Sequence, residues 1–190
     1  MAHNPDIHHR HSIRLKGHDY ATSGAYFVTL CVWQRDCLFG EVVNGEMVLN
    51  DMGRIVLDEW ERTPQLRSNV ELDVYAIMPN HFHALFHIHE QDGEQALCPT
   101  LDPRGNGDRA HVGAPLRRQS GTIGSIVAGF KSATTKRINM VRNTLGCPVW
   151  QRNYYERVIR NGQELSRARE YVVNNPIQWD LDKENPANNR

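Results

Sequence analysis

The chain has 190 residues, of which 39% are hydrophobic and 23% charged, so it has room for one globular domain with a real core. We therefore expect a single domain over residues 1–190. No run approaches the roughly 20 apolar residues of a membrane span, and the first residues contain no apolar signal core. This excludes a membrane partner and predicts a cytoplasmic location. The four cysteines form no CxxC pair, which favours free thiols over a zinc ribbon or a redox motif.

A net charge of zero hides a strong segregation of charge along the chain. Residues 36–100 hold 3 Lys/Arg against 12 Asp/Glu, whereas residues 101–170 hold 13 Lys/Arg against 5 Asp/Glu. Such asymmetry predicts a local basic surface for a polyanion. The alternative is that the acidic and basic segments neutralise each other in the folded chain.

Strands and helices are predicted for most of the chain outside two polar segments. In chain order we expect a strand over 25–33, a hairpin over 38–49, a helix over 51–62, strands over 70–78 and 81–89, a helix over 121–142, a strand or strand-and-turn over 149–159 and a helix over 163–175. Residues 1–24 read as a polar N-terminal arm and residues 90–120 as an exposed inserted loop. The economical arrangement is an α+β fold. It is a ferredoxin-like (RRM-like) β-α-β-β-α-β sheet backed by helices, with an extra hairpin and a C-terminal helix.

Short-range signals set the boundaries of several elements. Asn44-Gly45 lies between two apolar runs, which is the strongest short hairpin signal. Asp51 is predicted to cap the first helix, and Pro64 to stop it. Asn161 is predicted to cap the last helix, which Pro176 ends.

The second strand of the central pair carries histidines on one face. Side chains alternate along a strand, so His81 and His83 point the same way, while Phe82 points into an apolar face. Two neutral imidazoles on one face are a ready pair of metal ligands, although a histidine on a half-exposed strand can equally be a solvated side chain. A zinc site that also uses His87 and His89 is a further alternative. Four ligands on one flat strand cannot close a tetrahedron, so at most two or three could share an ion.

The last predicted helix brings a tyrosine and an amide onto one stripe. The residues of this stripe are Leu165, Ala168, Tyr171, Val172 and Asn175. Residues four apart are neighbours on a helix, so Tyr171 and Asn175 could meet the imidazoles if the helix packs across the histidine face. Tyr171 could then be a nucleophile and the Asn175 carbonyl oxygen a third ligand, a donor set that suits Mg²⁺ or Mn²⁺ holding a phosphate. The alternative is core packing for Tyr171 and a helix C-cap for Asn175.

These segments resemble single-tyrosine HUH transposases. Residues 78–83, Met-Pro-Asn-His-Phe-His, are similar to the His-hydrophobe-His motif of that family, and residues 169–176 are similar to its catalytic tyrosine helix. Three further segments resemble the branch of REP-associated tyrosine transposases: residues 11–15, 24–29 and 150–161. The resemblance covers most of residues 11–185 and leaves out residues 90–120.

The resemblance implies a metal-dependent enzyme that nicks single-stranded DNA beside a hairpin and transfers the strand through a 5′-phosphotyrosine and a free 3′-OH. It makes Tyr171 the nucleophile, His81 and His83 ligands of Mg²⁺ or Mn²⁺, and Asn175 the third ligand, where insertion-sequence transposases usually have Gln. The implied partner is a single-stranded DNA hairpin, bound by a monomer or a homodimer. Candidate phosphate contacts, each of which could equally be a solvated surface charge, are Arg14, Lys16, Lys131, Arg152, Arg157 and Arg160.

A binding module without chemistry is the alternative function. The same ferredoxin-like sheet could grip hairpin DNA or RNA, as RNA-recognition sheets do. Tyr154 and Tyr155 are rival nucleophiles, but neither is followed by an amide four residues later. Base stacking or packing is the alternative role for both tyrosines.

Overall fold

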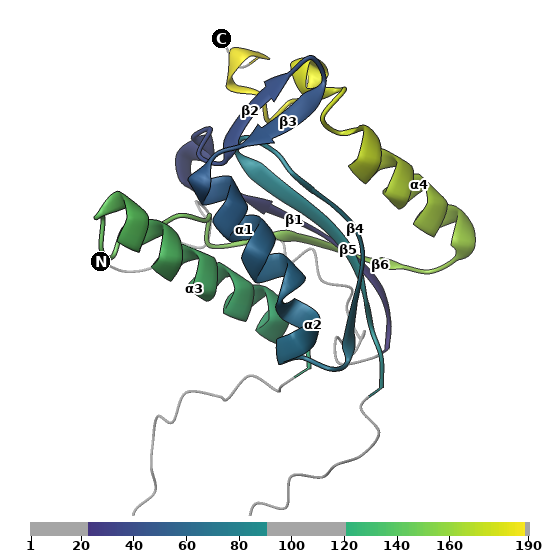
Figure 1. Cartoon of the computed structure of the whole chain (residues 1–190). Coiled ribbons are helices and arrows are strands. Elements are labelled where there is room, and N and C mark those ends of the chain that lie inside the picture. Colours follow the sequence, from purple (N-terminus) through teal and green to yellow (C-terminus); the bar gives the residue numbers. More distant parts are fainter. Residues whose placement is uncertain (1–22, 91–120, 189–190) are drawn as a thin grey trace, which may run out of the picture.

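A four-stranded antiparallel sheet forms the centre of the computed structural model, which describes residues 23–90 and 121–188 (Figure 1). Its strand order is β4-β5-β1-β6. In chain order the strands are β1 (Gly24–Cys31), β4 (Val70–Ile77), β5 (His81–Ile88) and β6 (Tyr155–Ile159). This is the arrangement of a ferredoxin-like β-α-β-β-α-β sheet, so the predicted fold class is confirmed. The strand predicted first in the chain is an interior strand of the sheet.

Helices cover both faces of this sheet. They are α1 (Asp51–Glu61), α2 (Thr63–Leu66), α3 (Ile123–Arg142) and α4 (Gly162–Asn174). Helices α1 and α3 lie side by side on one face, and α4 lies on the other (Figure 1). Strands β2 (Gly40–Val43) and β3 (Glu46–Leu49) form a separate hairpin. Its turn has φ of 53° at Asn44 and 80° at Gly45, the positive values that the Asn-Gly signal predicts.

The alternation along β5 divides the apolar core into two layers. Phe82 faces α1 and α3, where its ring lies 5.1 Å from that of Trp60 and 5.3 Å from that of Phe130. On the other face, Leu85 belongs to a smaller cluster with Phe27 and with Val172 of α4. The predicted histidine face is therefore covered by a helix, and the solvated alternative does not hold for its first two histidines.

Local contacts correct three predicted boundaries. The cap of α1 is Asn50, whose side-chain oxygen accepts the Gly53 N–H at 3.0 Å, and the predicted cap Asp51 is the first helical residue. Pro64 does not stop α1, because the helix ends at Glu61 and the proline lies in the first turn of α2, where a missing N–H costs nothing. Of the two predictions for 149–159, a continuous strand is wrong: the ladder forms only from Tyr155, after an isolated bridge between Trp150 and Val32, which is closer to the predicted strand-and-turn.

Ion pairs join the acidic and basic halves of the chain. Arg137 of α3 binds Glu59 of α1 at 2.7 Å and Asp58 at 3.0 Å. Arg169 of α4 binds Asp73 of β4 at 2.8 Å. Burial opposes ionisation of Asp73, but the hydrogen bonds from Arg169 and His87 hold its pKa below the usual value. Part of the charge segregation is thus neutralised between packed elements, as the alternative reading of the charge pattern expects.

Two predicted segments fall almost wholly outside the described residues. These are the arm over 1–24, with Arg14 and Lys16, and the loop over 90–120, with Cys98. The described cysteines, all free thiols, are Cys31, Cys37 and Cys147. Among the helices of residues 23–90 and 121–188, none has both the length and the apolar character needed to cross a membrane. Short 3-10 turns follow two of the elements. The turn η1 (Trp33–Arg35) follows β1, and η2 (Trp179–Leu181) and η3 (Pro186–Asn188) follow α4.

Candidate active site

Two neighbouring imidazoles are held in fixed orientations at the start of β5. His81 lies opposite Cys31 of β1 and His83 opposite Thr29. The His83 Nδ1 is 2.8 Å from the Thr29 hydroxyl oxygen, and the His81 Nδ1 is 2.9 Å from the side-chain oxygen of Asn80. The two imidazole centroids are 4.6 Å apart. Because both Nδ1 atoms are occupied, the two Nε2 atoms are left for other partners.

The Asn80 amide determines which His81 nitrogen carries the proton. Its Nδ2 donates to the carbonyl oxygens of Arg35 and Glu184, at 3.0 and 2.6 Å, which leaves Oδ1 facing His81. An amide oxygen only accepts, so His81 is protonated at Nδ1 and presents a lone pair at Nε2. Burial lowers the pKa of His81 and takes the pKa of His83 well below its ordinary value, so both rings are neutral at pH 7. Neutral imidazole is the form that ligates metals.

Helix α4 brings the predicted tyrosine and amide to these nitrogen atoms. Asn161 caps the helix, as predicted. The Tyr171 hydroxyl lies 3.4 Å from His83 Nε2, and the Asn175 side-chain oxygen lies 3.3 Å from His81 Nε2. Tyr171 is 45% exposed, whereas Asn175 is only 2% exposed. The tyrosine side chain can therefore be reached from solvent, whereas the amide is enclosed.

A carboxylate that the sequence patterns did not identify lies beside the same histidine. The turn η2 places Trp179 against the site, with its ring 6.0 Å from that of His81. Asp182 follows, and its Oδ2 lies 3.8 Å from His81 Nε2. Burial raises the pKa of Tyr171, and the negative charge of Asp182 raises it further. The segment after Pro176 has neither helical nor strand periodicity, so its sequence gave no signal for this contact.

The donor set of the site fits a divalent cation. His81 Nε2 and Asn175 Oδ1 are both acceptors, yet they face each other at 3.3 Å without a proton between them. Two acceptors at this distance repel each other, whereas both can ligate a cation placed between them. Within residues 23–90 and 121–188, no three His, Cys, Asp or Glu side chains form a metal-binding cluster, so an ion here needs the amide. His81, His83 and Asn175 would hold it.

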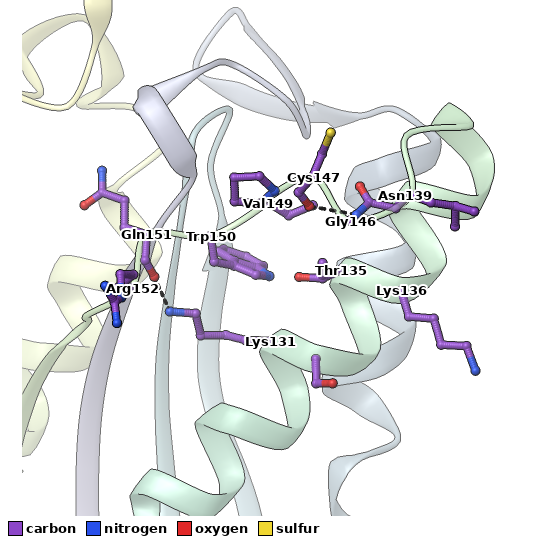
Figure 2. Close-up of a pocket in the computed structure, with 13 residues that line it drawn as sticks. Lys131, Thr135, Lys136, Asn139, Gly146, Cys147, Val149, Trp150, Gln151 and Arg152 are labelled. Atoms are coloured by element: carbon purple, nitrogen blue, oxygen red, sulfur yellow. Dashed lines mark hydrogen bonds between the residues drawn. The ribbon is translucent and has the colours of Figure 1, made fainter.

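The predicted phosphate contacts on the described chain occupy different environments. Lys131 lines a pocket beside α3, where its amine donates to the main-chain carbonyl of Gln151 (Figure 2) and where burial lowers its pKa to about 8. Arg152 lines the same pocket, which has a volume of about 540 Å³ and lies between α3 and residues 145–152. Arg157 is exposed and pairs with a carboxylate of α4 at 3.2 Å, and Arg160 is exposed just before that helix.

Strand β6 extends the site face of the sheet. Tyr155 is 41% exposed, and its ring lies 6.2 Å from that of Phe27, which in turn stacks on His83 at 5.6 Å. Arg157 lies opposite Phe27 in the β1–β6 ladder. Tyr154, by contrast, packs against the core layer under α1 and α3. Of the two rival tyrosines, only Tyr155 is thus near the histidine pair.

Comparison with known proteins defines first the class of fold and then the family. A solved structure of a REP-associated tyrosine transposase bound to a REP hairpin aligns with a TM-score of 0.55 and 14% identity, over 90% of this chain and 77% of that one. The chain thus has a transposase-like fold. A putative transposase from Deinococcus radiodurans aligns with a TM-score of 0.45 and 14% identity, over 85% of this chain and 97% of that one.

Sequence comparison identifies a close relative. An uncharacterized protein of Haemophilus influenzae is 41% identical over 180 residues, which make up 95% of each chain. The chain belongs to the same family as that protein. No family model matches the chain.

Proposed function

We propose that the protein is a metal-dependent nuclease and strand transferase that cuts single-stranded DNA beside hairpins, with Tyr171 as its nucleophile. The observation that carries this proposal is that the Tyr171 hydroxyl lies 3.4 Å from His83 Nε2. Beside it, the Asn175 side-chain oxygen lies 3.3 Å from His81 Nε2. The fold that the chain shares with a transposase bound to a REP hairpin supports a DNA hairpin as the substrate.

The proposed reaction is a transesterification. The Tyr171 oxygen attacks the scissile phosphorus, and the bond from phosphorus to the 3′ oxygen breaks as the bond to tyrosine forms. The phenol proton passes to water on the exposed side of the ring, and the departing 3′ oxygen takes up a proton. The 5′-phosphotyrosine conserves the energy of the phosphodiester, so a second 3′-OH can reverse the step without ATP.

A phenol with a raised pKa is a poor nucleophile, which is why this site would need a metal. Bound by His81, His83 and Asn175, Mg²⁺ or Mn²⁺ would withdraw charge from the phosphate oxygens and fix the in-line geometry. The residues of the chain prepare this arrangement in advance. Thr29 and Asn80 hold the two imidazoles in orientation, and the packing of α4 holds the tyrosine and the amide.

The single strand is proposed to run along β6 toward Tyr171. The exposed ring of Tyr155 can stack on a base, and Arg157 on the same face can contact a phosphate. Arg152 and Arg160 are proposed as further phosphate contacts, together with the residues of the N-terminal arm. Each phosphate contact that is removed should make the salt dependence of binding less steep.

A denaturing gel tests the chemistry and the nucleophile together. Purified protein is incubated with end-labelled single-stranded hairpins from the DNA that flanks its gene, in Mn²⁺ or in EDTA. We expect a protein-linked band in Mn²⁺ that is lost in EDTA, in Tyr171→Phe and in His83→Ala. Tyr155→Phe is the matched control and should keep the band. An adduct in Tyr171→Phe would refute the assignment of the nucleophile. Hairpin binding with no adduct in any condition would instead favour the non-catalytic binding module.

A further inference from the structure

We propose that Asp182 is the anionic group beside the metal site, acting on the ion through a bound water molecule, and that its carboxylate strengthens the binding of a divalent cation. This inference rests on the proposed function, because it concerns the same site. It goes beyond that function in making the turn after α4 a working part of the metal centre.

The lack of charge on the other donors favours such a group. His81, His83 and Asn175 are neutral ligands, and they are 0%, 3% and 2% exposed. Mg²⁺ and Mn²⁺ are hard cations that proteins hold chiefly through carboxylate oxygens. An ion with two positive charges is costly to bury among neutral donors alone, because water no longer solvates it. A nearby carboxylate offsets that cost.

The two oxygens of Asp182 have different roles in the structure. Oδ1 accepts the Glu184 N–H at 2.8 Å, which closes a tight turn and orients the carboxylate. Oδ2 is thereby left on the side of His81, 3.8 Å from Nε2. Since that nitrogen presents a lone pair, both atoms are acceptors. A water molecule bound to the cation could donate to Oδ2 while the His81 Nε2 lone pair ligates the cation.

The surrounding turn holds the Asp182 backbone in place. Its carbonyl oxygen accepts the Asn185 N–H at 3.0 Å and the Asn188 side-chain amide at 2.9 Å. Trp179, which is 8% exposed, anchors the start of the turn. Asn80 donates to the Glu184 carbonyl with one end of its amide and accepts from His81 with the other. A single side chain therefore positions both the histidine and the turn that carries the carboxylate.

Binding of Mn²⁺ to the full chain without DNA, followed by titration calorimetry or by the loss of the free-ion EPR signal, tests this inference. Asp182→Asn is the variant of choice, because its side-chain oxygen can still accept the Glu184 N–H. We expect it to weaken Mn²⁺ binding about 10- to 100-fold. Asp182→Glu, which keeps the charge, should retain more of the affinity than Asp182→Asn. Asp180→Asn, in the same turn and exposed, is the matched control and should bind Mn²⁺ like the wild type.

The outcomes separate this inference from the proposed function. Wild-type Mn²⁺ affinity in Asp182→Asn would overturn the role of Asp182 and leave the tyrosine chemistry standing. If that variant also lost stability in EDTA, Asp182 would be an ion-pair partner of His81 rather than a metal group. If the wild-type protein binds no Mn²⁺, the variant His83→Ala has no affinity to change. That result would overturn both the metal site and the role of Asp182. Unfolding curves in EDTA establish that each variant is folded.

Discussion

Buried neutral histidines should make the metal-free protein sensitive to mild acid. Burial lowers the pKa of His81 and of His83 below the ordinary value of 6.5. As the pH falls through 6.5, the unfolded chain binds protons at these positions that the folded chain does not bind. The free energy of unfolding therefore decreases as the pH falls, until the folded-state pKa values are reached. The contribution of the two histidines to stability is complete only well above pH 6.5.

The size of the effect follows from the ordinary pKa and the burial of the rings. One pH unit below 6.5, each histidine that stays neutral in the folded protein lowers the free energy of unfolding by roughly 1 to 2 kcal/mol. The pair should thus lower the free energy of unfolding by up to about 3 kcal/mol between about pH 7.5 and about pH 5.5. The carboxylate of Asp182 counteracts burial at His81, so His83 should supply the larger share.

Urea unfolding in EDTA at the two pH values measures this loss. The double variant His81→Gln, His83→Gln should lose clearly less stability than the wild type over the same pH range, whatever its absolute stability. An equal loss in the wild type and in the His81, His83 double variant would refute the reasoning.

Two further predictions concern the folded state. Asn50→Ala should lower the free energy of unfolding by about 1 kcal/mol because it removes the cap of α1, whereas Asp51→Ala should cost only a few tenths of that; urea unfolding of the pair decides which residue is the cap. Trp150→Phe should cost about 1 kcal/mol more than Trp60→Phe, because Trp150 Nε1 donates to the Thr134 hydroxyl at 2.8 Å while Trp60 Nε1 has no partner among the described residues. Equal costs in thermal or chemical unfolding would contradict the second prediction.

Local sequence patterns were sufficient for most of the fold. The alternation along β5 located the apolar face that contains Phe82, and Asn44-Gly45 located the hairpin turn. The choice between Asn50 and Asp51 could not be made from sequence. Both are good caps, and only the backbone conformation of the residue before the helix decides between them.

The candidate site was predictable where its residues share one element. His81 and His83 are two apart on a strand, and Tyr171 and Asn175 are four apart on a helix, so periodicity pairs each set. Thr29 was missed because its contact with His83 depends on the register between β1 and β5, which no local pattern specifies. Asp182 was missed for a similar reason, since a turn without periodicity carries it to the site.

The position of β1 affects how the protein folds. This strand pairs with β5 on one side and with β6 on the other, and the pairing of Ala25 with Ile159 joins segments from opposite ends of the described chain. The sheet is complete only when Ala25 and Ile159 meet, which closes the long stretch of chain between them. Contacts between residues so far apart in the sequence slow folding. Until β6 arrives, one edge of β1 offers unpaired backbone groups to other chains. Refolding at high protein concentration should therefore favour aggregation over the native state.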